Sequence, residues 1–124
     1  MNQPTPHIDG YHAHVYYDAT TKPKAQSLAT EALDRLPVEI GGFSDKPVGP
    51  HPVGNLQLIF KPSAFASVVP WLMMNRDGLD VLVHPLTADA ARDHDRDGLW
   101  LGRQLQLRPH SHSRDYAPDL LPST

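Results

Sequence analysis

Two kinds of hydrophobic periodicity follow one another along this chain of 124 residues, and their order restricts the folds it can adopt. Apolar residues recur at every second position in some segments, as in a half-buried strand, and at helical spacing in two others. The strand pattern covers residues 11–18, 55–61 and 79–85, with weaker patterns at 38–48 and 99–107. The helical pattern covers residues 20–37 and 63–75.

Prolines mark the two predicted helices in different ways. Pro23 lies near the start of the first helix and Pro37 lies just past its end, where proline is well tolerated. Pro70 falls inside the second helix, where a proline costs about 3 kcal/mol or a kink. We therefore expect the second helix to bend at Pro70 or to begin only at Ser67.

The order strand, helix, strand, strand, helix, strand predicts an α+β fold of the ferredoxin-like βαββαβ type, with an extra C-terminal strand. Both helices would cover one face of an antiparallel sheet, with the first and third strands at its centre and the fourth beside the first. Alternation assigns to the helix-covered face Val15, Tyr17, Leu56, Leu58, Phe60, Val81 and Val83. It assigns to the open face His12, His14, Tyr16, Gln57, Ile59, Leu82 and His84. A one-residue bulge would reverse an assignment.

Composition narrows the class of protein and its partners. The length suits one domain, which we place at residues 10–109 between an N-terminal arm, 1–9, and a C-terminal tail, 110–124. A net charge of −3 argues against nucleic acid and anionic membranes as partners. The start of the chain lacks a signal-peptide pattern, and no apolar run approaches the ~20 residues of a membrane span, so a cytoplasmic protein is expected.

Histidines from three predicted segments converge on the open face. His12 and His14, two positions apart in one strand, point the same way, on the order of 6–7 Å apart at their Cα atoms. His84 ends the neighbouring strand, and His51 is held between two prolines just before the third strand. With no cysteine in the chain, a metal would need nitrogen and oxygen ligands. The pattern predicts a metal site at His12, His14, His51 and His84, although exposed or core histidines are the plainer alternative.

Residues 92–97, RDHDRD, are expected to form a solvated charged loop. His94 in this loop follows the His84 strand by one short turn and could reach the same cavity. Tyr16 shares the histidine face. A two-histidine, one-carboxylate site would need an acidic residue, for which Asp18 and Glu39 are possible, but Gln57 occupies the facing position, so mainly histidine ligation is favoured.

Three histidine-containing motifs occur in order along the chain: YHAHVYYD, VGPHPVGNLQLIF and VLVHPLT…DH…WLG. With these motifs the chain resembles the DOPA 4,5-dioxygenase family over about residues 10–108. The resemblance implies an extradiol dioxygenase that cleaves a small catechol, DOPA or a relative, with O2 at a non-haem Fe(II) centre. It also implies a homodimer. Purified protein could instead carry zinc or nickel, because such metals compete for nitrogen sites.

Extradiol cleavage also needs a group that takes a proton from the catechol and later returns it. His94, or one of the four predicted ligands, could be this proton carrier, and Tyr16 could hydrogen-bond the substrate. Two alternatives remain open: a non-catalytic dimeric binding domain of the same fold, and a zinc-binding protein or hydrolase.

Overall fold

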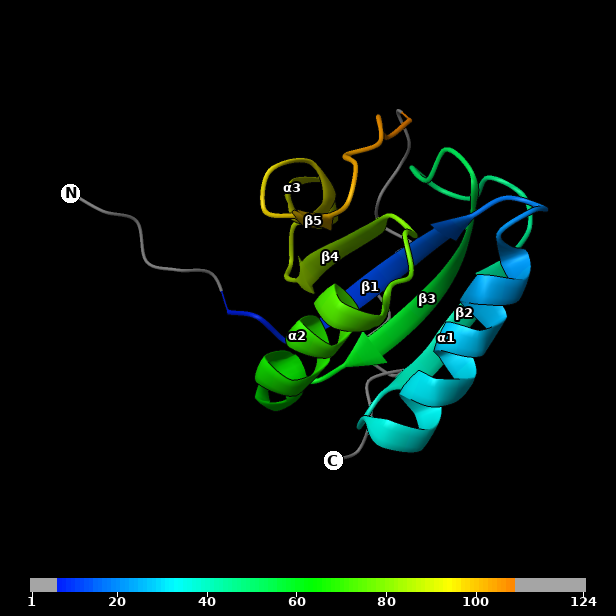
Figure 1. Ribbon diagram of the computed structural model, residues 1–124. Coiled ribbons are helices and arrows are strands. Elements are labelled where there is room, and N and C mark those ends of the chain that lie inside the picture. The colour runs from blue at the N-terminus through cyan, green and yellow to red at the C-terminus, as the bar shows by residue number, and fades with distance from the viewer. Residues whose placement is uncertain (1–6, 109–124) are drawn as a thin grey trace.

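The computed structural model describes residues 7–108, which form a five-stranded sheet with two long helices (Figure 1). The strands are β1 (Gly10–Tyr17), β2 (Glu39–Ser44), β3 (Gly54–Phe60), β4 (Val81–Leu86) and β5 (Leu99–Leu101). The helices are α1 (Lys22–Arg35), α2 (Phe65–Asn75) and the short α3 (Ala90–Asp95), with a 3₁₀ turn, Pro62–Ala64, before α2. The strand order is β2-β3-β1-β4-β5, with every neighbouring pair antiparallel. This confirms the predicted α+β, ferredoxin-like arrangement, with β5 as the extra strand.

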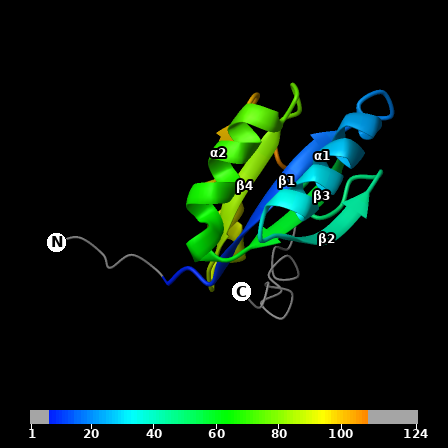
Figure 2. The same cartoon turned by 60° about the horizontal axis from the view of Figure 1, so that its bottom comes forward.

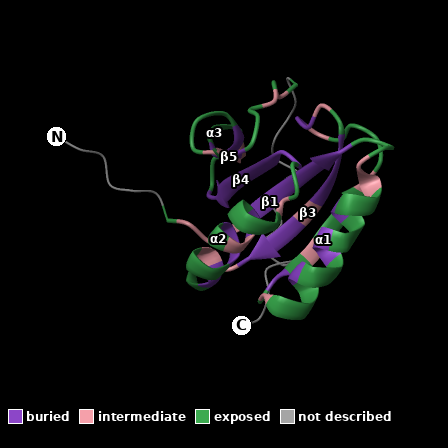
Figure 3. Ribbon diagram, viewed as in Figure 1, coloured by how far each residue is buried: buried purple, intermediate pink, exposed green. Residues whose placement is uncertain are grey.

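The main core lies between the sheet and its two long helices, which Figure 2 shows side by side on one face. α1 contributes Ala25, Leu28, Ala29 and Ala32, and α2 contributes Val68, Val69 and Leu72. The sheet side of this core is Ala13, Val15, Tyr17, Leu56, Leu58, Phe60, Val81 and Val83. The alternation in the sequence therefore assigned the core face correctly, and the inner strands are buried along their length (Figure 3).

The opposite face is not open, and that expectation is wrong. Ile59 and Leu82 on this face are at most 1% exposed. Later segments of the chain fold over it: Trp100 stacks on Tyr16 with ring centroids 5.8 Å apart, and Gly98 lies against Leu82. The chain itself thus supplies a second layer, and the side chains of this face lie in an interior.

Local structure departs from the sequence pattern at α2 and β5. α2 begins at Phe65 and runs through Pro70, so the alternative start at Ser67 is wrong. Pro70 lies in the middle of the 11-residue α2 and removes one helical hydrogen bond, and packing of the buried Val68, Val69 and Leu72 offsets that loss. β5 spans only three residues of the expected 99–107.

The expected solvated loop at residues 92–97 is instead mostly helical. The side chain of Asp89 caps α3 by accepting a hydrogen bond from the Arg92 amide at 3.1 Å. Asp93 is 1% exposed and accepts hydrogen bonds from the Thr87 amide, at 2.8 Å, and from the Thr87 hydroxyl. These bonds fasten α3 to the end of β4 and turn His94 inward.

Within residues 7–108, no helix has the length and apolar character needed to cross a membrane. The predicted tail, 110–124, and most of the predicted arm, 1–9, lie outside the described residues.

Candidate metal centre

Five histidine side chains meet on the sheet face opposite α1 and α2, and each is at most 3% exposed. They are His12 and His14 on β1, His84 on β4, His51 in the loop before β3, and His94 on α3. Strand pairing brings the first three together, because His12 is the register partner of His84 and His14 shares its face. The structure thus places the four histidines predicted from the sequence in one cluster, and His94 joins them.

The imidazole rings are in close contact. Ring centroids lie 3.8 Å apart for His14 and His51, 3.9 Å for His84 and His94, and 5.2 Å for His12 and His84. Two groups of three have candidate ligand atoms within 4.8 Å of one another: His12, His14 and His84, and His14, His51 and His94. His14 belongs to both groups and lies at the centre of the cluster.

Each of the five rings uses its Nδ1 atom for a hydrogen bond to a residue outside the cluster. The pairs are His12 with the Gln57 amide (2.8 Å), His14 with Asn55 Oδ1 (2.9 Å), His51 with the Tyr16 hydroxyl (2.7 Å), His84 with the Pro85 carbonyl (2.9 Å) and His94 with the Ala90 carbonyl (2.8 Å). Outer partners of this kind fix the ring orientation and tautomer of metal-binding histidines.

A carbonyl oxygen only accepts hydrogen bonds, so His14, His84 and His94 carry their ring proton on Nδ1 and a lone pair on Nε2. The Nε2 atoms of His14 and His84 face each other at 3.0 Å. Two lone pairs at this distance repel unless a cation lies between them. Two imidazole nitrogens bound at right angles to one ion, each about 2.1 Å from it, would lie about 3.0 Å apart. The donor set and its spacing therefore fit a divalent metal ion.

Burial keeps these rings neutral, as metal ligation requires. Burial, followed by the neighbouring His94, lowers the pKa of His12 to about 3. Burial also lowers the pKa of His14 and of His84 well below the usual histidine value, and repulsion from neighbouring histidines adds to it. Their lone pairs are thus available at neutral pH.

The candidate carboxylate ligands lie elsewhere. Asp18 is exposed and accepts a hydrogen bond from the Thr21 amide at 2.9 Å, and Glu39 is exposed on the edge strand β2. Both groups among residues 7–108 that could hold a metal ion consist of histidines alone. The geometry agrees with the expectation of mainly histidine ligation.

Asn55 and Asp93 were not singled out from the sequence. Alternation along β3 places Asn55 on the histidine face, two residues before Gln57, so a signal for it was present. The role of Asp93 depends on the bonds to Thr87, which no local pattern indicates.

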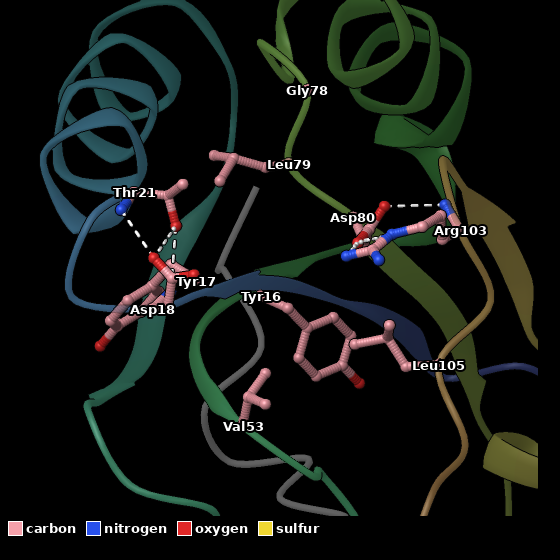
Figure 4. Close-up of a pocket in the computed structure, with 10 residues that line it drawn as sticks. All are labelled: Tyr16, Tyr17, Asp18, Thr21, Val53, Gly78, Leu79, Asp80, Arg103 and Leu105. Atoms are coloured by element: carbon pink, nitrogen blue, oxygen red, sulfur yellow. Dashed lines mark hydrogen bonds and ion pairs between the residues drawn. The ribbon is translucent and has the colours of Figure 1, made fainter.

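One cavity reaches the histidine cluster, and a second lies beyond Tyr16. One, of about 100 Å³, reaches His14 and His51 and is lined by Phe43 and Val48 together with Asn55 and Gln57. The other, of about 190 Å³, lies on the far side of Tyr16, whose ring projects between Val53 and Leu105 (Figure 4). At one end of this second cavity Arg103 forms an ion pair with Asp80 at 3.0 Å. Tyr16 thus separates the second cavity from the histidines.

Comparisons with known proteins agree on one family. The sequence model of the Dopa 4,5-dioxygenase family matches residues 11–111. A DOPA 4,5-dioxygenase of Amanita muscaria is 34% identical over 109 residues, which cover 81% of this chain and 48% of that protein. An uncharacterized 21.2 kDa protein of Botryotinia fuckeliana is 36% identical over 110 residues, which cover 78% of this chain and 60% of that protein.

A solved structure is similar as well. The crystal structure of a candidate dioxygenase from Nostoc punctiforme superposes with a TM-score of 0.79 at 51% identity, covering 81% of this chain and 87% of that chain. The chain spans about half to three fifths of the length of the curated relatives it matches.

Proposed function

This chain belongs to the Dopa 4,5-dioxygenase family, and on that premise we propose that it is a non-haem Fe(II)-dependent extradiol dioxygenase. Its substrate would be a small catechol, DOPA or a relative, and O2. The observation that carries the proposal is the pair of Nε2 lone pairs on His14 and His84 that face each other at 3.0 Å inside a buried histidine cluster.

His12, His14 and His84 would hold the iron, because their candidate ligand atoms form one compact group on adjacent strands. His51 is the fourth predicted ligand. Imidazole is a common ligand of Fe(II), and three such ligands leave positions open. When bound, the iron would supply adjacent sites at which both catechol oxygens and O2 can meet.

The surrounding residues favour an anionic aromatic ligand. Neutral imidazoles would leave the positive charge of a bound Fe(II) uncompensated, so an ionised catechol would be a better partner there than a neutral ring. The cavity of about 100 Å³ beside His14 and His51 offers Phe43 and Val48 as apolar walls for the ring. Burial of the cluster excludes bulk water, which strengthens each electrostatic contact.

Tyr16, His51 and His94 are the candidate proton-handling groups. The Tyr16 hydroxyl and His51 Nδ1 are 2.7 Å apart, close enough for a proton to move between them. His94 donates its Nδ1 proton to the Ala90 carbonyl at 2.8 Å, so its Nε2 can accept a proton from a catechol hydroxyl and return it. We assign the acid–base role to His94, with Tyr16 hydrogen-bonding the substrate or His51.

The test is oxygen uptake by protein reconstituted anaerobically with Fe(II), offered a panel of catechols that includes DOPA, with absorbance scanned for a yellow ring-cleavage product. The H84A variant should lose uptake, and H7A, which changes an exposed histidine, should keep it. If the protein binds iron but turns over no catechol, the proposal that it is a dioxygenase is overturned. Failure to bind iron or zinc would overturn the metal centre itself.

We also propose that the protein forms a homodimer, as the family resemblance implies. Among residues 7–108, β2 is an edge strand with no strand on its outer side, and its Phe43 is 41% exposed, so it offers a backbone edge and an apolar side chain. Light scattering coupled to size-exclusion chromatography would show twice the chain mass, and a monomer at high concentration would contradict the proposal.

A further inference from the structure

His12 is held differently from the other histidines of the cluster. Its ring meets His14 and His84 only edge-on, with interplanar angles of 80° and 73°. Its Nε2 has no hydrogen-bond partner among residues 7–108, and its one side-chain hydrogen bond within that range is the 2.8 Å contact in which the Gln57 side-chain N–H donates to Nδ1. The orientation of His12 therefore depends on Gln57.

Gln57 reaches His12 along a diagonal of the sheet. In the β1–β3 ladder Gln57 is the register partner of His14, and its long side chain extends to the histidine two residues earlier. On its other side Gln57 pairs with Gly42 of β2. The amide thus lies over β3 with the edge strand next to it.

The edge strand makes room for this amide at a bulge. The register between β2 and β3 shifts between Ile40 and Gly42, which leaves Gly41 as the extra residue. A Cβ atom at Gly41 would overlap Oε1 of Gln57 and lie 2.5 Å from Cδ1 of Ile59. A Cβ atom at the adjacent Gly42 would meet nothing within 4 Å.

We propose that Gly41 and Gln57 form a positioning pair that aims Nε2 of His12 at the metal. Gly41 supplies the space, Gln57 supplies the hydrogen bond, and neither would touch the ion. With the ion bound, the Gln57 amide would turn over so that Oε1 accepts a proton from Nδ1 and the lone pair of Nε2 faces the metal. The inference rests on the proposed function to the extent that His12 is a ligand. Because the atoms that a Cβ at Gly41 would displace are the ends of flexible side chains, G41A should still fold, with the amide pushed away from His12.

The test measures the affinity of the intact chain for Zn²⁺ by competition with a chromogenic chelator. G41A and Q57M should each weaken Zn²⁺ binding by about 10–100-fold, the range typical of lost outer-shell partners. The double variant should be no weaker than either single variant, because both changes break the same contact. G42A is the matched control and should bind as the parent does.

A second readout separates positioning from general destabilisation. Q57E places a carboxylate oxygen beside Nδ1 of His12, where it can accept a proton from that nitrogen, so Q57E should bind Zn²⁺ more tightly than Q57M. Ring-nitrogen NMR should show that proton on Nδ1 of the Zn²⁺-bound protein. Three results would each overturn the inference. G41A and G42A could weaken Zn²⁺ binding equally, the losses of affinity could multiply in the double variant, or Q57E could bind Zn²⁺ no better than Q57M. Catechol turnover is not part of this test, so its result is independent of whether the reaction itself is as proposed.

Discussion

Acid should destabilise the metal-free protein through its buried histidines. In the unfolded chain His12 has a pKa near 6.5, and in the folded chain burial lowers that pKa to about 3. Between these values the unfolded state binds more protons than the folded state, so the free energy of unfolding falls as pH falls below 6.5. The loss continues until about pH 3, where the folded state also takes up the proton.

This loss is appreciable beside the total free energy of unfolding of a small domain. Each such group costs about 1.4 kcal/mol per pH unit in this window, so His12 alone removes about 1 kcal/mol between pH 7.5 and 5.5. The pKa values of His14 and His84 are lowered in the same direction, so these two residues add to the loss. Small domains are stable by about 5–15 kcal/mol in total.

The test is urea unfolding of chelator-treated protein at pH 7.5, 6.5 and 5.5, monitored by tryptophan fluorescence. It measures how the free energy of unfolding changes with pH. H12N removes one of the titrating groups and should reduce the loss of stability between pH 7.5 and 5.5 by about 1 kcal/mol. H7N, at an exposed position, should leave it unchanged. A free energy of unfolding that stays constant down to pH 5.5, or an H12N slope equal to that of the parent, would refute the reasoning.

Three further results are expected. Zn²⁺ at about 100 times its Kd should raise the free energy of unfolding by about 2.7 kcal/mol, and H84A should abolish the rise in the urea midpoint. T87V leaves the buried carboxylate of Asp93 short of a donor and should cost about 1–3 kcal/mol in urea unfolding, whereas T87S should cost much less. Y16F removes the hydroxyl next to His51 and should lower kcat for catechol-dependent oxygen uptake by about 100-fold, while the affinity for Zn²⁺ stays unchanged. Turnover equal to that of the parent would exclude a proton-handling role for Tyr16.

Alternation along the inner strands was sufficient to predict both faces of the sheet. Val15 and Leu58 lie in the core and His14 lies opposite, because the β1–β3 and β1–β4 registers run without a shift. The meeting of His12 with His84 followed from the strand order alone, once the fold had been inferred. These features depend on a two-residue period, which a sequence displays directly.

The second layer over the histidines could not be inferred in this way. The sequence around His94 is rich in charge, and its burial depends on the bonds between Thr87 and Asp93, which form only when β4 is in place. The bulge at Gly41 was equally hidden, because the two adjacent glycines of β2 look alike in the sequence and differ only in what surrounds them. Tertiary contacts decide both features.

The distance along the chain between the members of the cluster bears on how the protein matures. His14 and His84 lie 70 positions apart, and β4 must pair with β1 before they meet. During synthesis the first half of the chain can pair β1 with β3, but the ligands assemble only after residues 81–94 have left the ribosome. A metal held by His14 and His84 would therefore bind late, after β4 has paired with β1.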